Sequence, residues 1–336
     1  MRSSGCISLT SRRIAEALVT PQVQVDRLSS GCVTSDIHFQ QLHESMGACV
    51  AMGVISHKRI NVDGLGVFVR ESGDRSRPTL VLLPGYPSST RAYVRLIDLL
   101  ANHWHVVAID YPGFGSSDPL PDEPTFDDLA VVTAATIDAL GIGDYAVYMF
   151  DFGAPVGFRI ALDHDERVRA VITQNGNAYT EGFGPGVAPL AEWWADKDAG
   201  EATVDWFVSL AGTQHQWQAG ARDVEHIDPE QALADQLVLD RPGRAAYMKA
   251  LLWDYQNNPP RYPQWQAWLR RRQPALLAIW GANDPFFIPA GAQAYRNDVP
   301  DAEVVLLDTG HFALEEELDE IALQIETLMA ATFAAE

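Results

Sequence analysis

Cysteine is scarce in this chain of 336 residues, and its distribution excludes two classes of small stabilised protein. The sequence holds 3 cysteines, Cys6, Cys32 and Cys49, and all of them lie near the amino terminus. An odd number of cysteines without a metal-ligand spacing indicates neither a disulfide framework nor a zinc site. We therefore expect a protein of a reducing compartment, the cytoplasm.

Long apolar runs and basic leader patterns are also missing. A membrane-spanning helix needs roughly 20 consecutive apolar residues, and the segment from Ala48 to Ile55 is too short for one. No continuous apolar segment follows Arg2, Arg12 and Arg13, so we expect no secretory signal.

Positive charge is low relative to negative charge. The chain has 24 Lys plus Arg against 45 Asp plus Glu, for a formal net charge of -21. The only basic cluster, Arg270-Arg271-Arg272, is too short to reverse this balance. We therefore expect neither nucleic acid nor an anionic membrane as a partner. For the oligomeric state we expect either a monomer or a homodimer.

Short apolar strands alternating with amphipathic helices are what the sequence does contain from residue 57 onward. This alternation predicts an α/β fold, with a mostly parallel central sheet that helices cover on both faces. The first two strands are expected to form a hairpin through Asp63-Gly64. The predicted strands are Lys58–Val62, Leu65–Arg70, Pro78–Leu83, His105–Asp110, Tyr145–Phe150, Val168–Thr173, Ala275–Trp280 and Glu303–Leu307. The predicted helices are Arg91–Ala101, Thr125–Leu140, Ala154–Asp163, Ala290–Arg296 and Ala313–Phe333.

The alternation stops between residues 175 and 273, where the sequence is rich in tryptophan and in helix-forming residues. We interpret this segment as a helical lid inserted into a core formed by residues 55–174 and 274–336. Residues 1–54 show no period and no helix caps, and we expect them to form a poorly ordered appendage outside the main domain.

Polar residues that could carry chemistry follow four of the predicted strands. They are Gly85-Tyr86, Asp151, Asp284 and His311. Ligands of open parallel sheets bind at the carboxyl ends of the strands, so these residues are expected to meet. Three of them have a simpler interpretation as well: Asp151 could cap a helix, Asp284 could open a turn, and His311 could be a loop histidine.

Five segments together resemble a known family. They are Pro84-Gly85-Tyr86-Pro87, Asp110 to Ser117, Phe150 to Ala154, Trp280 to Asp284, and Gly310-His311-Phe312. With them the chain from about residue 57 to 333 resembles the α/β-hydrolase superfamily. Within it the closest likeness is to the branch with an aspartate nucleophile, which contains epoxide hydrolases and haloalkane or haloacid dehalogenases.

The resemblance implies a role for each of these residues. Asp151 would be the nucleophile, His311 the base and Asp284 the acid that orients it, while the backbone N–H groups of Tyr86 and Phe152 would form the oxyanion hole. A carboxylate is suited to displacing a leaving group from an sp³ carbon, because its attack on an ester or amide would give an anhydride. This chemistry needs no cofactor and no metal.

Two reactions fit such a site. Epoxide opening calls for a proton donor on the lid, for which Tyr255 resembles one family tyrosine, and Tyr179 and Tyr247 are candidates for another. Halide release calls for N–H donors, and at two positions that often supply them the chain has Tyr86 and Phe152 instead. We predict hydrolysis of a small apolar epoxide to a vicinal diol. The alternatives are a dehalogenase and a non-catalytic member of the fold that binds a small ligand.

Overall fold

The computed structural model describes residues 54–198 and 200–334. The expectations for residues 1–53, which include the three cysteines and the poorly ordered appendage, lie outside the described residues. No helix in the described part of the chain is long and apolar enough to cross a membrane.

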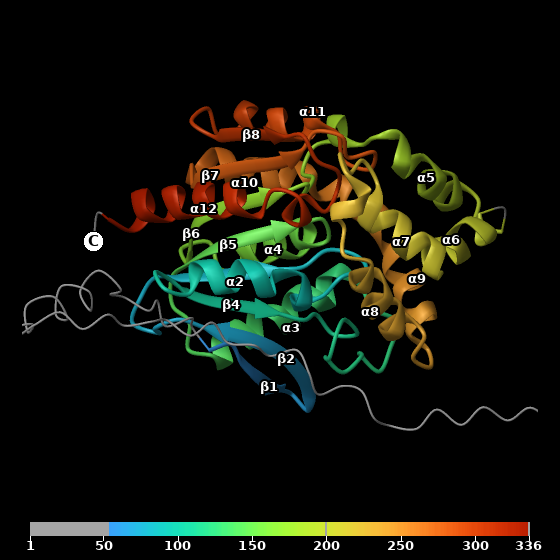
Figure 1. Ribbon diagram of the computed structural model, residues 1–336, viewed down its shortest axis with the longest axis horizontal. Helices are drawn as coiled ribbons and strands as arrows, with labels where there is room; N and C mark the ends of the chain where they lie inside the picture. Colours follow the sequence, from blue (N-terminus) through green and yellow to red (C-terminus); the bar gives the residue numbers. More distant parts are fainter. Residues whose placement is uncertain (1–53, 199, 335–336) are drawn as a thin grey trace, which may run out of the picture. The chain divides into compact units, whose positions relative to one another are not determined.

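An eight-stranded sheet forms the centre of the fold, in the order β1-β2-β4-β3-β5-β6-β7-β8 (Figure 1). Strand β2 runs antiparallel to its neighbours β1 and β4, and the remaining neighbours pair in parallel. The expected hairpin is present, and Asp63 and Gly64 at its turn both have positive φ angles. The strands are β1 (Ser56–Val62), β2 (Leu65–Ser72), β3 (Thr79–Leu83), β4 (His105–Ile109), β5 (Tyr145–Phe150), β6 (Val168–Gln174), β7 (Ala275–Gly281) and β8 (Glu303–Leu307).

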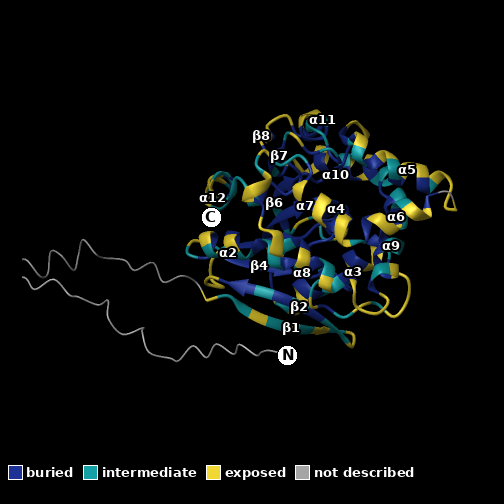
Figure 2. Ribbon diagram, turned by 45° about the vertical axis from the view of Figure 1, so that its right-hand side comes forward, coloured by how far each residue is buried: buried dark blue, intermediate teal, exposed yellow. Residues whose placement is uncertain are grey.

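Helices cover both faces of the sheet, which explains why its central strands are apolar throughout. Leu80 and Leu82 of β3 pack on one face with the helices α2 (Val94–Leu100) and α12 (Leu318–Phe333). Val81 and Leu83 point the other way, toward α3 (Phe126–Ala139), α4 (Gly153–Asp163) and α11 (Pro289–Ala294). Figure 2 shows the resulting buried interior of the sheet between helices with exposed outer sides.

The helix ends follow their local sequence. Thr125 forms a capping box with Asp128 at the start of α3, and Gly141, with φ 70°, follows its last turn. One predicted helix is interrupted: Ala313–Glu315 form a 3₁₀ turn, and α12 begins at Leu318. The carboxylate of Glu316, between the two, accepts hydrogen bonds from the backbone N–H groups of Arg222 and Asp223. This tertiary contact accounts for a break that the continuous amphipathic pattern did not predict.

The segment between β6 and β7 is helical. Within the described residues, its only β-bridge is an isolated antiparallel one between Phe183 and Phe287. Figure 1 shows α5 to α9 gathered beyond the ends toward which the parallel strands point. We refer to residues 175–273 as the insert. Its α-helices are α5 (Ala188–Ala195), α6 (Glu201–Phe207), α7 (Leu210–Gln218), α8 (Pro229–Leu239), α9 (Arg244–Asp254) and α10 (Tyr262–Arg272).

Candidate active site

A sharp turn between β5 and α4 presents Asp151. Its φ angle is 50°, in the left-handed region that few residues other than glycine adopt. The turn is tight because strand and helix approach closely: a Cβ added at Gly153 would lie 2.6 Å from the carbonyl oxygen of Leu83. The local sequence therefore forces the backbone to turn at Asp151 and holds its side chain at the carboxyl end of the sheet.

The loop after β3 closes over the Asp151 carboxylate. The backbone N–H of Tyr86 donates to Oδ1 of Asp151 at 2.6 Å. The approach requires a glycine, since a Cβ at Gly85 would lie 2.5 Å from the Cβ of Asp151. One of the two predicted N–H donors is thus within hydrogen-bonding distance of the carboxylate, and the N–H of Phe152 acts on the same group.

His311 lies between the two acidic side chains that were predicted as its partners. Its Nδ1 is 2.7 Å from Oδ2 of Asp284, and its Nε2 is 3.9 Å from Oδ2 of Asp151. The backbone N–H of His311 also donates to the carbonyl of Ala219 at the end of α7, which ties the histidine loop to the insert. The structure therefore brings together the three residues that the sequence placed after three separate strands.

Asp284 is held by two donors besides His311. The side-chain amide of Asn175 donates to Oδ2 at 2.7 Å, and the backbone N–H of Phe286 donates to Oδ1 at 2.7 Å. Asn175 has a φ angle of 47° and accepts a hydrogen bond from the N–H of Gly281, which fixes its amide. The sequence analysis missed Asn175, although its position directly after β6 was a signal that could have found it.

Burial and charge set the protonation of the site. Burial raises the pKa of Asp151 to about 6, against the opposing effects of His311 and the N–H groups of Tyr86 and Phe152. For His311, burial works against the charged form, but the neighbouring carboxylates of Asp284 and Asp151 outweigh it and raise the pKa above its ordinary value. The arrangement can present a buried carboxylate for attack beside a histidine oriented to accept a proton.

The raised pKa of Asp151 predicts an acid limb in the reaction that uses it. If Asp151 attacks as a carboxylate, protonation below pH about 6 removes the attacking group, so the rate of attack should fall about tenfold per pH unit there. The rate of single-turnover ester formation, measured between pH 4.5 and 8, checks this. A rate that stays level down to pH 4.5, as expected for a carboxylate with the ordinary aspartate pKa of about 3.9, would contradict it.

A small cavity lies against Asp151 and His311. It measures about 40 Å³, room for only a few water-sized groups, and core and insert both contribute to its wall. No lysine or arginine lines it among the described residues. Its walls are mostly aromatic, and the rings of Phe152 and Tyr255 lie 5.6 Å apart within them. The site is therefore suited to a small, uncharged and largely apolar group.

The predicted lid tyrosines separate into two groups. Tyr255 lines the cavity. Tyr179 donates instead to Oδ2 of Asp298 at 2.6 Å, and Tyr247 donates to the carbonyl of Pro112 at 3.0 Å. Neither of the latter two lines the cavity, so in this structure neither is placed to donate a proton to a group bound at Asp151. A helical sequence does not show which of its tyrosines face inward, because that depends on how the insert packs on the core.

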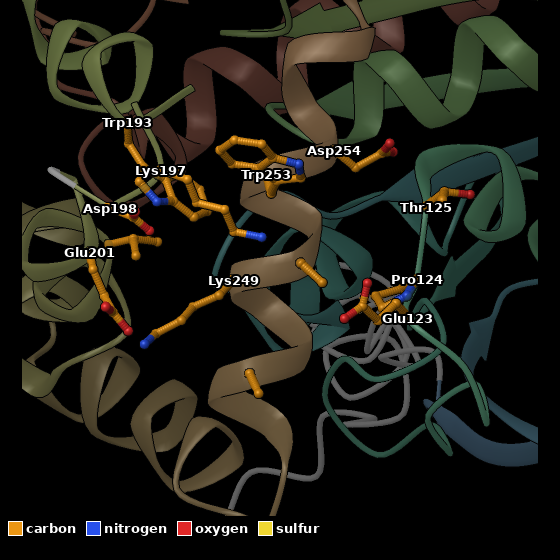
Figure 3. Close-up of a pocket in the computed structure, with 13 residues that line it drawn as sticks. Glu123, Pro124, Thr125, Trp193, Lys197, Asp198, Glu201, Lys249, Trp253 and Asp254 are labelled. Atoms are coloured by element: carbon orange, nitrogen blue, oxygen red, sulfur yellow. The ribbon is translucent and has the colours of Figure 1, made fainter. Parts of the chain in front are cut away.

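A larger cavity of about 440 Å³ lies between the insert and the loop before α3 (Figure 3). Its lining contains none of the predicted site residues, and both of its lysines already have partners. Lys197 lies 4.7 Å from the centre of the Trp253 ring, and Lys249 pairs with Asp205. In the described ranges, no three His, Cys, Asp or Glu side chains cluster as metal ligands would.

Comparison with known proteins gives the family. A family model described as the alpha/beta hydrolase fold matches residues 78–318. The chain belongs to the α/β-hydrolase fold family. An uncharacterized hydrolase of Saccharomyces cerevisiae is 39% identical over 280 residues, which cover 82% of this chain and 97% of that protein. This α/β-hydrolase is thus similar over most of its length to a relative named as a hydrolase.

Shorter matches and solved structures extend the comparison. A fluoroacetate dehalogenase of a Burkholderia species is 35% identical over 98 residues, which cover 28% of this chain and 32% of that protein. Epoxide hydrolase 4 of Mus musculus is 25% identical over 127 residues, which cover 37% of this chain and 35% of that protein. Haloalkane dehalogenase DbeA from Bradyrhizobium elkani superposes with a TM-score of 0.72 at 20% identity, covering 84% of this chain and all of the other (100%). The serine hydrolase CCSP0084 from Cycloclasticus zankles superposes with a TM-score of 0.68 at 14% identity. The superposition covers 83% of this chain and 99% of the other. At these identities the two structures show the fold alone.

Proposed function

We propose that this α/β-hydrolase opens a small, uncharged epoxide to a vicinal diol through a covalent ester on Asp151. The observation that carries the proposal is a buried carboxylate at the tip of the β5–α4 turn, with Nε2 of His311 3.9 Å from its Oδ2. Most nucleophiles at such a turn are serines, which suit acyl transfer. An aspartate there favours displacement at a saturated carbon, because the product is a hydrolysable ester.

In the first step, a carboxylate oxygen of Asp151 forms a bond to one epoxide carbon while the carbon–oxygen bond of the ring breaks. The electron pair of that bond goes to the ring oxygen, which takes a proton from the Tyr255 hydroxyl lining the same cavity. The opposite oxygen of Asp151 is oriented by the N–H of Tyr86. The product is a hydroxyalkyl ester of Asp151.

In the second step, water attacks the carbonyl carbon of that ester. Nε2 of His311 takes the proton of the water, and Asp284 on Nδ1 stabilises the imidazolium that forms. The negative charge that develops on the ester oxygen is next to the N–H groups of Tyr86 and Phe152. When the intermediate collapses, the ester carbon–oxygen bond breaks and the remaining proton of the attacking water passes to the departing alkoxide, which releases the diol and restores the carboxylate. The proton on His311 returns to the tyrosinate of Tyr255 through solvent.

The donors around Asp151 favour an epoxide over a halide. Phe152, directly after the nucleophile, has no donor in its side chain. The hydroxyl of Tyr86 donates to the carbonyl of Phe207 at 2.9 Å, and the indole of Trp194 donates to the carbonyl of Leu252 at 2.9 Å. A departing halide would thus find few N–H groups, whereas the Tyr255 hydroxyl can protonate an alkoxide.

The lining of the cavity also bears on the charge of the substrate. A haloacid brings a carboxylate that must be paired when it is buried. Since no lysine or arginine of the described residues lines the cavity, a haloacid substrate is disfavoured. A neutral haloalkane stays the second candidate, supported by the apolar walls of the cavity. Ligand binding without catalysis is the third, and the presence of Asp151, His311 and Asp284 in one cluster argues against it.

A panel of small terminal epoxides and matched bromo- and chloroalkanes, assayed side by side, tests the proposal. We expect diol from the epoxides at a rate well above the uncatalysed one, and little halide from the alkanes. Halide release without diol formation would replace epoxide hydrolysis by dehalogenation. Tight binding of an epoxide with no turnover would support the non-catalytic alternative.

A further inference from the structure

Gln216 is a polar side chain in the cavity that the proposed mechanism does not use. It lies on α7, is 4% exposed, and lines the cavity together with Asp151 and His311. The same helix ends at Ala219, whose carbonyl accepts the backbone N–H of His311, so its position relative to the catalytic histidine is held by a direct contact. No sequence pattern singles it out, since it is one of several glutamines in the insert.

Two other polar side chains of the cavity have hydrogen-bond partners of their own. Tyr86 and Trp194 donate to backbone carbonyls of Phe207 and Leu252, respectively. The hydroxyl of Tyr255 lies near that of Tyr262 without a hydrogen bond between them, so it stays available to the substrate. The side chain of Gln216 likewise makes no hydrogen bond to any of the described residues, and its amide atoms are not among the fully buried ones.

An amide that opens onto a small, mostly aromatic cavity is a destabilising choice for this position. Burying an amide away from bulk water costs free energy unless a hydrogen bond compensates for it, and leucine or methionine would fill the same space without that cost. In an active-site cavity the missing partner is supplied by the substrate. Gln216 and Asp151 line the same cavity of about 40 Å³, so a substrate bound for attack by Asp151 would lie close to Gln216 as well.

We propose that Gln216 donates a hydrogen bond from Nε2 to the ring oxygen of the epoxide and holds that oxygen together with the Tyr255 hydroxyl. This assignment rests on the proposed function. It fills the place of the second lid donor, for which neither Tyr179 nor Tyr247 is available.

The two donors do different work in the ring-opening step. As Asp151 forms its bond to carbon, the ring carbon–oxygen bond breaks and its electron pair moves to the oxygen. The proton comes from Tyr255, because an amide N–H is far too weak an acid to give one up. Gln216 stabilises the charge that accumulates on the oxygen before that proton arrives, and it returns unchanged. Its contribution therefore belongs to ester formation alone.

Single-turnover kinetics with a small terminal epoxide tests the assignment. Gln216→Met replaces the amide by an apolar side chain of similar length, and Gln216→Asn keeps an amide with a shorter reach. Gln214→Met, at an exposed position of the same helix, is the matched control. For Gln216→Met we expect ester formation to slow by about 100-fold, the typical loss for one donor to a developing oxyanion, with ester hydrolysis within about threefold of wild type. The rate of ester formation in Gln216→Asn should lie between those of Gln216→Met and wild type. The control variant should form and hydrolyse the ester at the wild-type rates.

The leaving group gives a readout that a purely structural role would not move. If the protein also accepts a bromoalkane of the same chain length, its ester formation should lose far less in Gln216→Met, because bromide needs less stabilisation than an alkoxide. An unchanged rate of ester formation, an equal loss for both leaving groups, or a loss confined to ester hydrolysis would each overturn the assignment. If wild-type protein forms no ester on Asp151 with any epoxide, the proposed function fails first and this assignment with it. If the wild-type protein forms the ester and Gln216→Met forms it at the same rate, the assignment of Gln216 is refuted and the proposed function stands.

Discussion

His311→Gln is expected to stop the reaction at the ester and to leave substrate covalently bound to Asp151. The reason is that the attack by Asp151 needs no base, whereas water must lose a proton to attack the ester, and Nε2 of His311 is the group positioned to take it. Turnover should fall by at least about 10³-fold while ester formation stays close to the wild-type rate. Intact-protein mass spectrometry after incubation with substrate measures the adduct directly.

The mass of that adduct distinguishes the two leading functions. Epoxide opening adds the whole substrate, since the ring oxygen stays attached and gains a proton. Haloalkane displacement adds the substrate less one molecule of hydrogen halide. His215→Gln, at an exposed histidine of α7, is the matched control and should turn over normally with no adduct. An active wild type whose His311→Gln variant never carries an adduct would argue against covalent catalysis.

Asp151→Ala is expected to remove ester formation altogether. Loss of a nucleophile that acts with its base as a unit typically lowers kcat by about 10⁴- to 10⁶-fold. The protein should stay folded, because the substitution removes a carboxylate whose burial is unfavourable, as its raised pKa indicates. The measurement is kcat with the best epoxide of the panel, together with the thermal melting temperature.

Two further variants make that result specific. Asp301→Ala removes an exposed aspartate and should leave activity unchanged. Asp151→Asn also removes the carboxylate, but asparagine tolerates a positive φ angle better than alanine does. Backbone strain therefore cannot account for a loss of activity in this variant. Residual ester formation above about one hundredth of the wild-type rate in Asp151→Ala would place the nucleophile elsewhere.

The sequence predicted the features that depend on local pattern and chain order. The strand ranges around Asp151 and His311 followed from apolar runs between turn residues, and the structure brings both residues to one end of a mostly parallel sheet. What it could not predict depends on side-chain direction within the insert. Tyr179, Tyr255 and Gln216 all lie in helical or irregular segments, and only packing on the core decides that the first faces Asp298 and the other two face the cavity.

Hydrogen bonds between residues far apart in the sequence could not be predicted either. Asn175 holds Asp284 across a separation of 109 positions in the sequence, and no periodicity connects them. The break between Ala313–Glu315 and α12 has the same origin, since it depends on a contact with Arg222 and Asp223 of the insert.

The turn at Asp151 separates placement from reactivity. Its φ angle of 50° is imposed by the crowding of β3, β5 and α4, and Gly85 and Gly153 provide the space, so the backbone would hold a serine at the same point. A serine hydrolase and a haloalkane dehalogenase share the surrounding fold with this chain. A change of nucleophile at this position would therefore alter the chemistry of the site without rebuilding its frame.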